Sequence, residues 1–491
     1  MTATNKATNK ATDRSRQNRF VFLDIMRGIA PVLVIYSHVV ALFLDPHGLD
    51  SPVVDLLSEQ LRDPLRLEQQ MGHLAVVMFF LVSGFIITQV GTSESHREFS
   101  IKRLFRIYPL LIATVGLTAI LSIWNLEVLR TGQHFEITLQ SVLTNFALAN
   151  YFMVPQVILL GVAWTLVIEV IFYSMVLSLL AVLRRWTWLA ILIELGLVLA
   201  ALLLAREFGP SFFLLSVNMS YLPVVLLGQV TWAVWSGRVP LWLGTVFGFA
   251  SWTLYVLGDI RNMGRLDDAY SSTCALGFGL FIVLLLAEPH LRPTRPISFL
   301  ADRSYSLYLM HGPIAFPVME GLRGVVPVWL AVVAGLALTV AAAEVTFRYV
   351  EQPGQRIGRR LTKRFRLKKA EPRKTPPERV EPAWPEPRQP EPRRGPQGVE
   401  PAWPGPGSGD APTVKRIRPV PALDEALPAR PPRPAPRPAP PPWPTRQPRP
   451  ATGPPAPPVN GVRNGHDVIR GELWDPDPDR VAGGGRHRRE D

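Results

Sequence analysis

The sequence predicts an all-α protein, a polytopic bundle of transmembrane helices followed by a long tail. Two observations predict this class. Between residues 21 and 350 the chain returns repeatedly to apolar runs of about 18 to 24 residues, the length that a helix needs to cross a ~30 Å hydrocarbon layer. Several runs, such as Val325 to Ala343, contain no charged residue on any side, whereas a surface helix of a soluble protein carries a polar face.

About ten stretches have the length and composition of a span. They lie at 21–44, 71–90, 108–126, 157–183, 186–205, 217–235, 239–257, 270–287, 299–318 and 325–347. An even number of spans places both termini on one side of the membrane. Residues 138–155 are also apolar but contain Asn145 and Asn150, which favours a re-entrant or interfacial segment over a span.

Basic residues in the connecting segments predict the orientation. With both termini in the cytosol, the cytosolic segments hold most of the lysines and arginines, as the positive-inside rule expects. These residues are Lys102, Arg103, Arg106, Arg184, Arg185, Arg238, Arg292, Arg295 and Arg303, then Arg356, Arg359, Arg360, Lys363, Arg364 and Arg366. Membrane orientation thus explains most of the net charge of +13, so we expect a multi-pass protein of the cell membrane and no nucleic-acid partner.

The termini flank a membrane domain predicted at residues 20–355. Residues 1–19 are polar and basic, and we expect them to be disordered and to contain no cleaved signal peptide. Residues 356–491 are first basic and then rich in proline, which predicts a disordered cytosolic tail. The tail repeats Val-Glu-Pro-Ala-Trp-Pro at 380–385 and 399–404. Such segments either dock to a proline-motif-binding partner or act as a solvated spacer.

Ionisable groups inside spans are costly, so they indicate function. Arg27 and His38 lie eleven residues apart in the first span, which is about three helical turns, so both fall on one stripe ~16 Å apart. Pro31 between them favours a bend. The predicted topology places Arg27 near the cytosolic mouth and His38 in the outer half.

Further polar groups extend this division. The fourth span carries Glu169, and the ninth carries Ser304, Tyr308 and His311 on one face. The predicted topology puts Glu169 and His311 in the outer half, together with His38. Arg103 and Arg106, one turn apart, lie on the cytosolic side, and their guanidinium groups are suited to bind phosphate. The sequence therefore predicts two zones, typical of a reaction that reaches across a membrane.

Two other functions also fit a charged membrane bundle. A transporter or flippase of a lipid or sugar intermediate would place charged groups along its substrate path, but it would also show inverted repeats and broken helices in both halves. The sequence contains no convincing internal repeat. A membrane scaffold that recruits partners through the proline-rich tail would need no intramembrane histidines.

Six motifs occur in order along residues 20–355. They are Asp24-x-x-Arg27-Gly28-x-Ala30 with His38, Phe79-Phe80-x-x-Ser83-Gly84-Phe85, Arg103-x-x-Arg106-Ile107-x-Pro109, Trp164-Thr165-Leu166-x-x-Glu169 with Tyr173, Ser304-Tyr305-x-Leu307-Tyr308-x-x-His311, and Glu351-x-Pro353. Together they resemble the acyltransferase family 3 of membrane O-acyltransferases.

The resemblance implies an O-acyltransferase whose donor is acyl-CoA, usually acetyl-CoA, with no tightly bound cofactor and no metal. The implied acceptor is a hydroxyl of a cell-surface glycan, a lipid-linked sugar or a secreted small molecule. Some relatives carry a soluble esterase-like domain after the membrane domain. The tail here contains no foldable domain of that kind, so we expect acceptor choice to reside in the membrane domain.

The resemblance also assigns roles to residues. It makes His38 the catalytic base, and it places Glu169 and His311 at motif positions that also belong to the catalytic group. Val170 stands where the family often has a second acidic residue, so a paired-carboxylate role is unsupported. The donor-side residues are Arg27, Arg103 and Arg106, and the remaining motif positions are Asp24, Ser83, Gly84, Trp164, Tyr173, Ser304 and Tyr308.

The chemistry of acyl transfer agrees with the choice of base. A hydroxyl is a poor nucleophile near neutral pH, so a base must take its proton as it attacks the thioester, and a neutral imidazole suits that task. The single cysteine, Cys274, has no base near it in the sequence, and we expect it to be a buried hydrophobe. Direct transfer and transfer through an acyl-enzyme both remain open.

Overall fold

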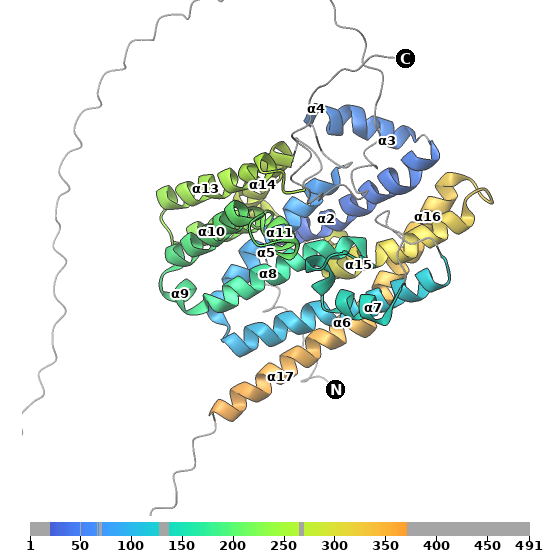
Figure 1. Ribbon diagram of the computed structural model, residues 1–491. Helices are drawn as coiled ribbons and strands as arrows, with labels where there is room; N and C mark the ends of the chain where they lie inside the picture. The colour runs from blue at the N-terminus through green and yellow to red at the C-terminus, as the bar shows by residue number, and fades with distance from the viewer. Residues whose placement is uncertain are drawn as a thin grey trace, which may run out of the picture. The chain divides into compact units, whose positions relative to one another are not determined.

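The computed structural model describes residues 20–49, 51–65, 67, 71–126, 137–264 and 270–370 (Figure 1). The described residues form helices and contain no β-strand, only an isolated bridge between Arg323 and Val326. The prediction of an all-α fold is therefore confirmed. The predictions for the N-terminal segment 1–19 and for the tail beyond residue 370 fall outside the described residues.

The helices follow one another along the chain with short connections. They are α2 (Val21–Val39), α3 (Pro52–Leu57), α4 (Asp63–Leu65), α5 (Gly72–Ser93), α6 (His96–Ile123), α7 (Leu139–Phe146), α8 (Trp164–Ser178), α9 (Leu180–Arg185), α10 (Thr187–Leu204), α11 (Pro210–Met219), α12 (Leu222–Trp235), α13 (Leu241–Ile260), α14 (Tyr270–Ala287), α15 (Arg295–Leu322), α16 (Val328–Thr346) and α17 (Gln352–Ala370).

Nine helical stretches in the described part of the chain are long and apolar enough to cross a membrane. They are Val21–His47, Gly72–Ser93, His96–Ile123, Gly161–Ser178, Thr187–Leu204, Pro210–Trp235, Leu241–Ile260, Ser271–His290 and Val328–Lys363. The tenth predicted span, 299–318, lies in α15, which has 28 residues but a more polar composition. The segment 138–155 forms only α7, of 8 residues, and a short 3-10 turn, so it is too short to cross.

Hydrogen bonds between connecting segments define one face of the bundle, which we call the basic face. Arg184, in the last turn of α9, donates to the carbonyl oxygens of Gly91 and Glu94, at the α5–α6 turn. Arg238, after α12, donates to the carbonyl oxygen of Arg184 at 3.2 Å. The carboxylate of Glu288, after α14, accepts from the first two backbone N–H groups of α2 at 2.8 Å each. The ring of Phe20, just before α2, contacts that of Trp235, at the end of α12, so the segments that follow α5, α9, α12 and α14 share this face.

Two contacts join described residues of other connections at the opposite face. Arg206, after α10, donates to the carbonyl oxygen of Arg261, after α13, at 3.4 Å. His47, after α2, lies 3.6 Å from Glu320, near the end of α15. Successive connections thus alternate between two faces, as they must in a bundle of spanning helices. The positive-inside rule assigns the basic face to the cytosol, which stays a prediction.

Two glycines bring α5 and α12 into close contact. A Cβ atom at Gly84 would lie 1.9 Å from the carbonyl oxygen of Val225, and a Cβ atom at Gly228 would lie 2.1 Å from that of Leu81. Because lipid offers no hydrophobic drive for helix association, such close backbone packing is a main source of stability in the membrane.

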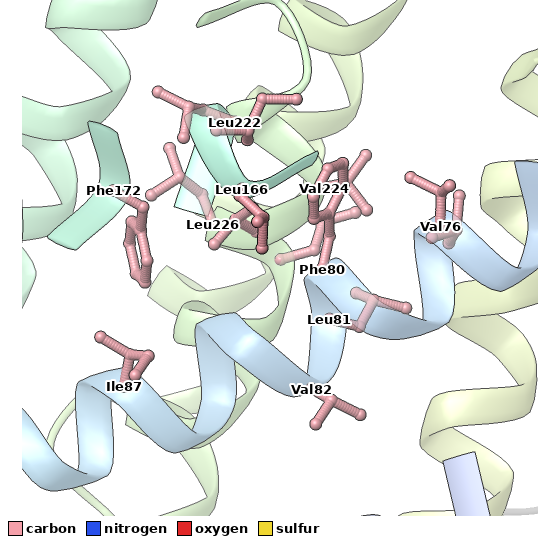
Figure 2. Close-up of a cluster of buried hydrophobic side chains, with 14 of the residues drawn as sticks. Val76, Phe80, Leu81, Val82, Ile87, Leu166, Phe172, Leu222, Val224 and Leu226 are labelled. Atoms are coloured by element: carbon pink, nitrogen blue, oxygen red, sulfur yellow. The ribbon is translucent and has the colours of Figure 1, made fainter. Parts of the chain in front are cut away.

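The core of the bundle lies around α5, which is the most enclosed of the candidate spans. In its apolar stretch of 18 residues, 78% of the residues are buried. Figure 2 shows part of this core, where Phe80 and Leu81 of α5 lie among side chains of α8 and α12. Leu166 and Phe172 of α8 and Leu226 of α12 are fully buried there. The core fixes α8 against α5, and α8 carries two of the polar residues of the site.

The helices α2 and α15 are parallel and in register. A Cβ atom at Gly28 would lie 3.5 Å from the backbone nitrogen of Ala301, and His38 contacts His311. Both pairs are separated by 273 positions, so α2 and α15 run in the same direction. This arrangement requires an odd number of crossings between the two helices, which excludes residues 138–155 as a further span.

The helix α17 lies along α6 (Figure 1). A Cβ atom at Gly354 would lie 3.0 Å from Pro109 Cγ, and one at Gly358 would lie 2.9 Å from Phe105 Cβ. The helix continues to Ala370, across the position 355/356 where the sequence predicts the end of the membrane domain; that boundary stays a prediction. Small residues at positions i and i+4 allow this packing although the segment is rich in charge.

Candidate active site

Two histidines meet where α2 and α15 run side by side. His38 Nδ1 lies 2.8 Å from His311 Nε2, and the two rings stack with their centroids 5.1 Å apart. His311 is 1% exposed, whereas His38 is only partly buried. The sequence predicted both histidines in one zone, and the structure brings them into direct contact.

The surroundings of His311 determine which nitrogen of His38 is basic. His311 Nδ1 lies 2.7 Å from the carbonyl oxygen of Tyr308, and because a carbonyl only accepts, this nitrogen is the donor. In a neutral ring Nε2 of His311 then accepts, so His38 Nδ1 donates to it. The remaining nitrogen of His38, Nε2, keeps its lone pair. The pair therefore presents a neutral imidazole that can take a proton at Nε2.

Tyr308 is held in place one turn before His311. Its hydroxyl lies 3.0 Å from Thr165 Oγ1 and 2.9 Å from the carbonyl oxygen of Val162. Its ring stacks on Phe79 of α5, with the centroids 6.4 Å apart and the planes 6° from parallel. Tyr308 thus links α15 to the start of α8 and to α5.

A narrow cavity of about 40 Å³ runs between α2, α5, α6, α8 and α15. On α2 its lining begins at Arg27 and ends at Val34, one turn before His38. On α15 it begins at Ser304 and ends at Tyr308, one turn before His311. Its walls are mostly apolar. The cavity therefore extends from the arginine end of the site toward the histidine pair.

Glu169 lies at the arginine end of this cavity, which corrects the prediction that it shares the depth of the histidines. Its carboxylate accepts from the Tyr173 hydroxyl and lies 3.4 Å from Ser83 Oγ, within electrostatic range of Arg106. The reason is the start of α8. Residues 153–160 are not helical, so Thr165 already reaches the level of Tyr308, and Glu169 lies one turn further toward the arginines.

The structure separates the two arginines that the sequence predicts to act together. Arg106 lines the narrow cavity and also a wider one beside it, whereas Arg103 lines neither. The Arg103 guanidinium instead lies over the rings of Phe99 and Tyr173, at 5.8 Å and 6.0 Å from their centroids. Arg103 thus contacts the ring whose hydroxyl donates to the site glutamate.

The wider cavity has a volume of about 390 Å³ and a polar lining. Arg27 and Arg106 line both cavities, so the two spaces adjoin at these side chains. The helix α17 supplies Arg356 and Arg359, and Glu351 lies between α16 and α17. A polar space with four guanidinium groups therefore opens at the end of the apolar one.

The other motif residues lie around this site. Ser304 lines the narrow cavity, and its hydroxyl donates to the carbonyl oxygen of Ala301 at 3.0 Å. Trp164 begins α8 and contacts the rings of Phe80 and Tyr221. Asp24 is buried in α2, one turn before Arg27, with bonding partners of its own. Cys274 is buried within α14.

Several site residues were not predicted from the sequence. Thr165 and Phe79 belong to sequence motifs, but only their contacts with Tyr308 identify them as residues of the site. Glu351 accepts from Ser306 Oγ at 2.7 Å and from Gln355 Nε2 at 3.0 Å, and so joins α15 to α17. In the sequence, the closing Glu-x-Pro motif indicated that Glu351 belongs to the site. For the arginines of α17, the sequence indicated only a basic segment that predicts membrane orientation, and no part in the site.

The geometry combines a base, a short apolar passage and a basic polar pocket. Within the described residues, no group of three or more histidine, cysteine, aspartate or glutamate side chains is placed to hold a metal ion. The arrangement can hold an anion at one end and remove a proton from a hydroxyl at the other.

Comparisons with known proteins agree with this combination. A family model described as an acyltransferase domain matches residues 20–348. Nodulation protein 10 of Rhizobium leguminosarum bv. viciae is 26% identical over 316 residues, which cover 57% of this chain and 82% of that protein. O-acetyltransferase OatA of Staphylococcus aureus is 25% identical over 337 residues, which cover 58% of this chain.

The match covers 53% of OatA, so the chain spans about half the length of that relative. No solved structure matches the chain.

Proposed function

Since the chain belongs to the acyltransferase family 3 of membrane O-acyltransferases, we propose that it moves an acyl group from acyl-CoA to a hydroxyl acceptor. The donor binds at the arginine end, and the acceptor approaches at the histidine pair. The acyl group is acetyl, which the name of OatA supports. The acceptor is a glycan of the cell surface, a lipid-linked sugar or a secreted small molecule, and the protein resides in the cell membrane.

The observation that carries the proposal is the cavity between Arg27 and the turn before His38. A CoA thioester has an anionic nucleotide end and a long, uncharged arm that ends in the acyl group. An arginine-lined pocket suits the first part and an apolar passage suits the second. The base then lies beyond the far end of that passage, on the side from which an acceptor would approach.

His38 acts as the general base in this proposal. Its Nε2 takes the proton of the acceptor hydroxyl while the hydroxyl oxygen attacks the thioester carbonyl. The tetrahedral intermediate collapses as the carbon–sulfur bond breaks, giving the ester, and the proton on His38 passes to the departing thiolate. His311 accepts from Nδ1–H throughout, which keeps Nε2 available and stabilises the transient imidazolium.

Aromatic side chains border the end of the passage where the acyl group would lie. The cavity volume is about 40 Å³, and the stacked rings of Phe79 and Tyr308 border its far end. Because two hydrogen bonds hold the Tyr308 hydroxyl, widening the passage requires more than a rotation of one side chain.

The test uses purified protein in lipid nanodiscs with acetyl-CoA that carries a labelled acetyl group. We expect release of CoA and transfer of label to an envelope extract, with slow hydrolysis when no acceptor is present. A protein that binds no acetyl-CoA and transfers no label would be a transporter or scaffold instead. Comparing acylated glycans and lipids of a deletion strain with those of its parent would then identify the acceptor.

A further inference from the structure

The wide polar cavity contains basic groups that neither the family motifs nor the predicted donor site include. Arg27 and Arg106 come from the membrane helices, but Arg356 and Arg359 come from α17, after the last span. The sequence explains the arginines of α17 only as determinants of orientation. Their position in a cavity of about 390 Å³ beside the donor passage indicates a binding role.

The position of α17 follows from its sequence. The preceding helix α16 has 19 residues, which at ~1.5 Å per residue already spans the hydrocarbon layer, so α17 continues beyond it. Gly354 and Gly358 then allow α17 to pack against Phe105 and Pro109 of α6. Since Arg106 directly follows Phe105, this contact brings Arg106 and the α17 arginines to one cavity.

The charge of the cavity favours an anion with several phosphate groups. Four guanidinium groups line it, against the carboxylates of Glu351 and Asp302. The Glu351 oxygens already accept hydrogen bonds from Ser306 and Gln355. Arg356 donates to Gln352 at 2.8 Å, and both Arg356 and Arg359 are exposed. Guanidinium forks on two walls of a polar space can hold phosphate groups that lie some distance apart.

We propose that Arg356 and Arg359 of α17 form a second phosphate-binding wall, which holds the phosphates of the donor's nucleotide opposite Arg27 and Arg106. This proposal rests on the proposed function and deepens it. The helix α17 is then part of the donor site, and the thioester arm leaves the cavity between Arg27 and Arg106 into the narrow passage. The same chemistry could come from the phosphate of an anionic lipid, and the test separates these sources.

The experiment measures CoA binding by calorimetry to full-length protein in nanodiscs of phosphatidylcholine alone. The variant is Arg356→Ala with Arg359→Ala, and the matched control is Arg360→Ala, an exposed arginine of the same helix that does not line the cavity. We expect CoA affinity to fall about 10- to 100-fold in the double variant, as for lost charge-assisted hydrogen bonds. The control should bind like the parent, and acetyl-pantetheine, which lacks every phosphate of CoA, should bind parent and variant equally.

Two results would overturn the proposal. Parental CoA affinity in the double variant, with affinity lost in Arg106→Ala, would remove α17 from the donor site and leave the proposed function intact. An effect of the double variant that appears only when the nanodiscs contain phosphatidylglycerol would assign the cavity to a lipid headgroup. A parent protein without any CoA binding would instead refute the proposed function itself.

Discussion

The order of protons in the contact between His38 and His311 follows from backbone hydrogen bonding of His311. The Tyr308 oxygen makes His311 Nδ1 a donor, and this orders the protons along the pair so that His38 Nε2 is the basic atom. Without His311, the His38 ring would lose the acceptor for Nδ1–H and could adopt either tautomer. His311 is therefore a positioning residue in the proposed reaction.

We expect His311→Leu to lower acyl transfer roughly 10²-fold, within the usual contribution of a positioned base. His311→Asn, whose amide can still donate and accept, should recover part of the loss. The measurement is the turnover number with acetyl-CoA binding in parallel, and binding should stay at the parental value in both variants. Equal turnover in the leucine and asparagine variants would contradict the proton order.

The two arginines of α6 should respond differently to replacement. Arg106→Ala removes a guanidinium that lines both cavities, and we expect the dissociation constant of CoA to rise about 10- to 100-fold. Arg103→Ala removes contacts with Phe99 and Tyr173, so we expect a lower melting temperature and a smaller change in CoA binding. Calorimetry and thermal unfolding of both variants test this. Equal losses of CoA affinity would show that both arginines hold the donor.

The sequence predicted which residues belong to the candidate site, but it predicted only in part where each of them lies along the bundle. The spacing of Arg27 and His38 along one helix correctly placed them at two ends of one stripe. Glu169 was placed too far out, because the apolar residues before Gly161 look like the start of the span although they are not helical. Hydropathy reports which residues tolerate lipid and does not report where the helix begins.

At the scale of the helices, the bundle is held by close backbone contacts. The α5–α12 contact at Gly84 and Gly228 leaves no room for a methyl group, since the nearest backbone oxygens would lie about 2 Å from it. The sequence alone does not identify the helix that packs on Gly84, because many helices offer small residues. The packing role of Gly354 and Gly358 could not be predicted either, because it depends on their contact with α6.

We expect Gly84→Ala to destabilise the protein by about 1–3 kcal/mol, because α5 and α12 must separate to admit the methyl group. Gly116→Ala is the matched control, since a Cβ atom there meets no atom within 4 Å. Alanine at that helical position should be neutral or stabilising by up to about 1 kcal/mol. Thermal unfolding in one detergent compares the two. A Gly84→Ala protein as stable as the parent would refute the packing.

At the scale of the molecule, the connections alternate between the basic face and the opposite face. Their charge predicts that the basic face is cytosolic. We test this with Ser236→Cys on the basic face and Glu207→Cys on the opposite one, each in a Cys274→Ala background. Both positions are exposed and outside the site. An impermeant thiol reagent added outside intact cells should label Glu207→Cys and not Ser236→Cys, and the reverse pattern would invert the orientation.

The proline-rich tail should be dispensable for the chemistry. Every residue of the described site precedes residue 370, and the composition of the tail predicts no packed core. Truncation after Lys369 retains nearly all of α17, so we expect membrane insertion, CoA binding and acyl transfer close to those of the full chain. A well-expressed truncation that binds CoA and transfers nothing would show that the tail takes part in the reaction or in acceptor delivery.

The central claim is that His38 takes the proton of the acceptor, and His38→Gln tests it most directly. Glutamine has a polar side chain of similar reach but cannot take up a proton near neutral pH, so insertion and acyl-CoA binding should persist. The measurement is the acylation rate per folded molecule, with acyl-CoA binding in parallel. We expect binding like that of the parent and acyl transfer lower by roughly 10² to 10⁴. Near-parental turnover per folded molecule would contradict the role of His38 as the base.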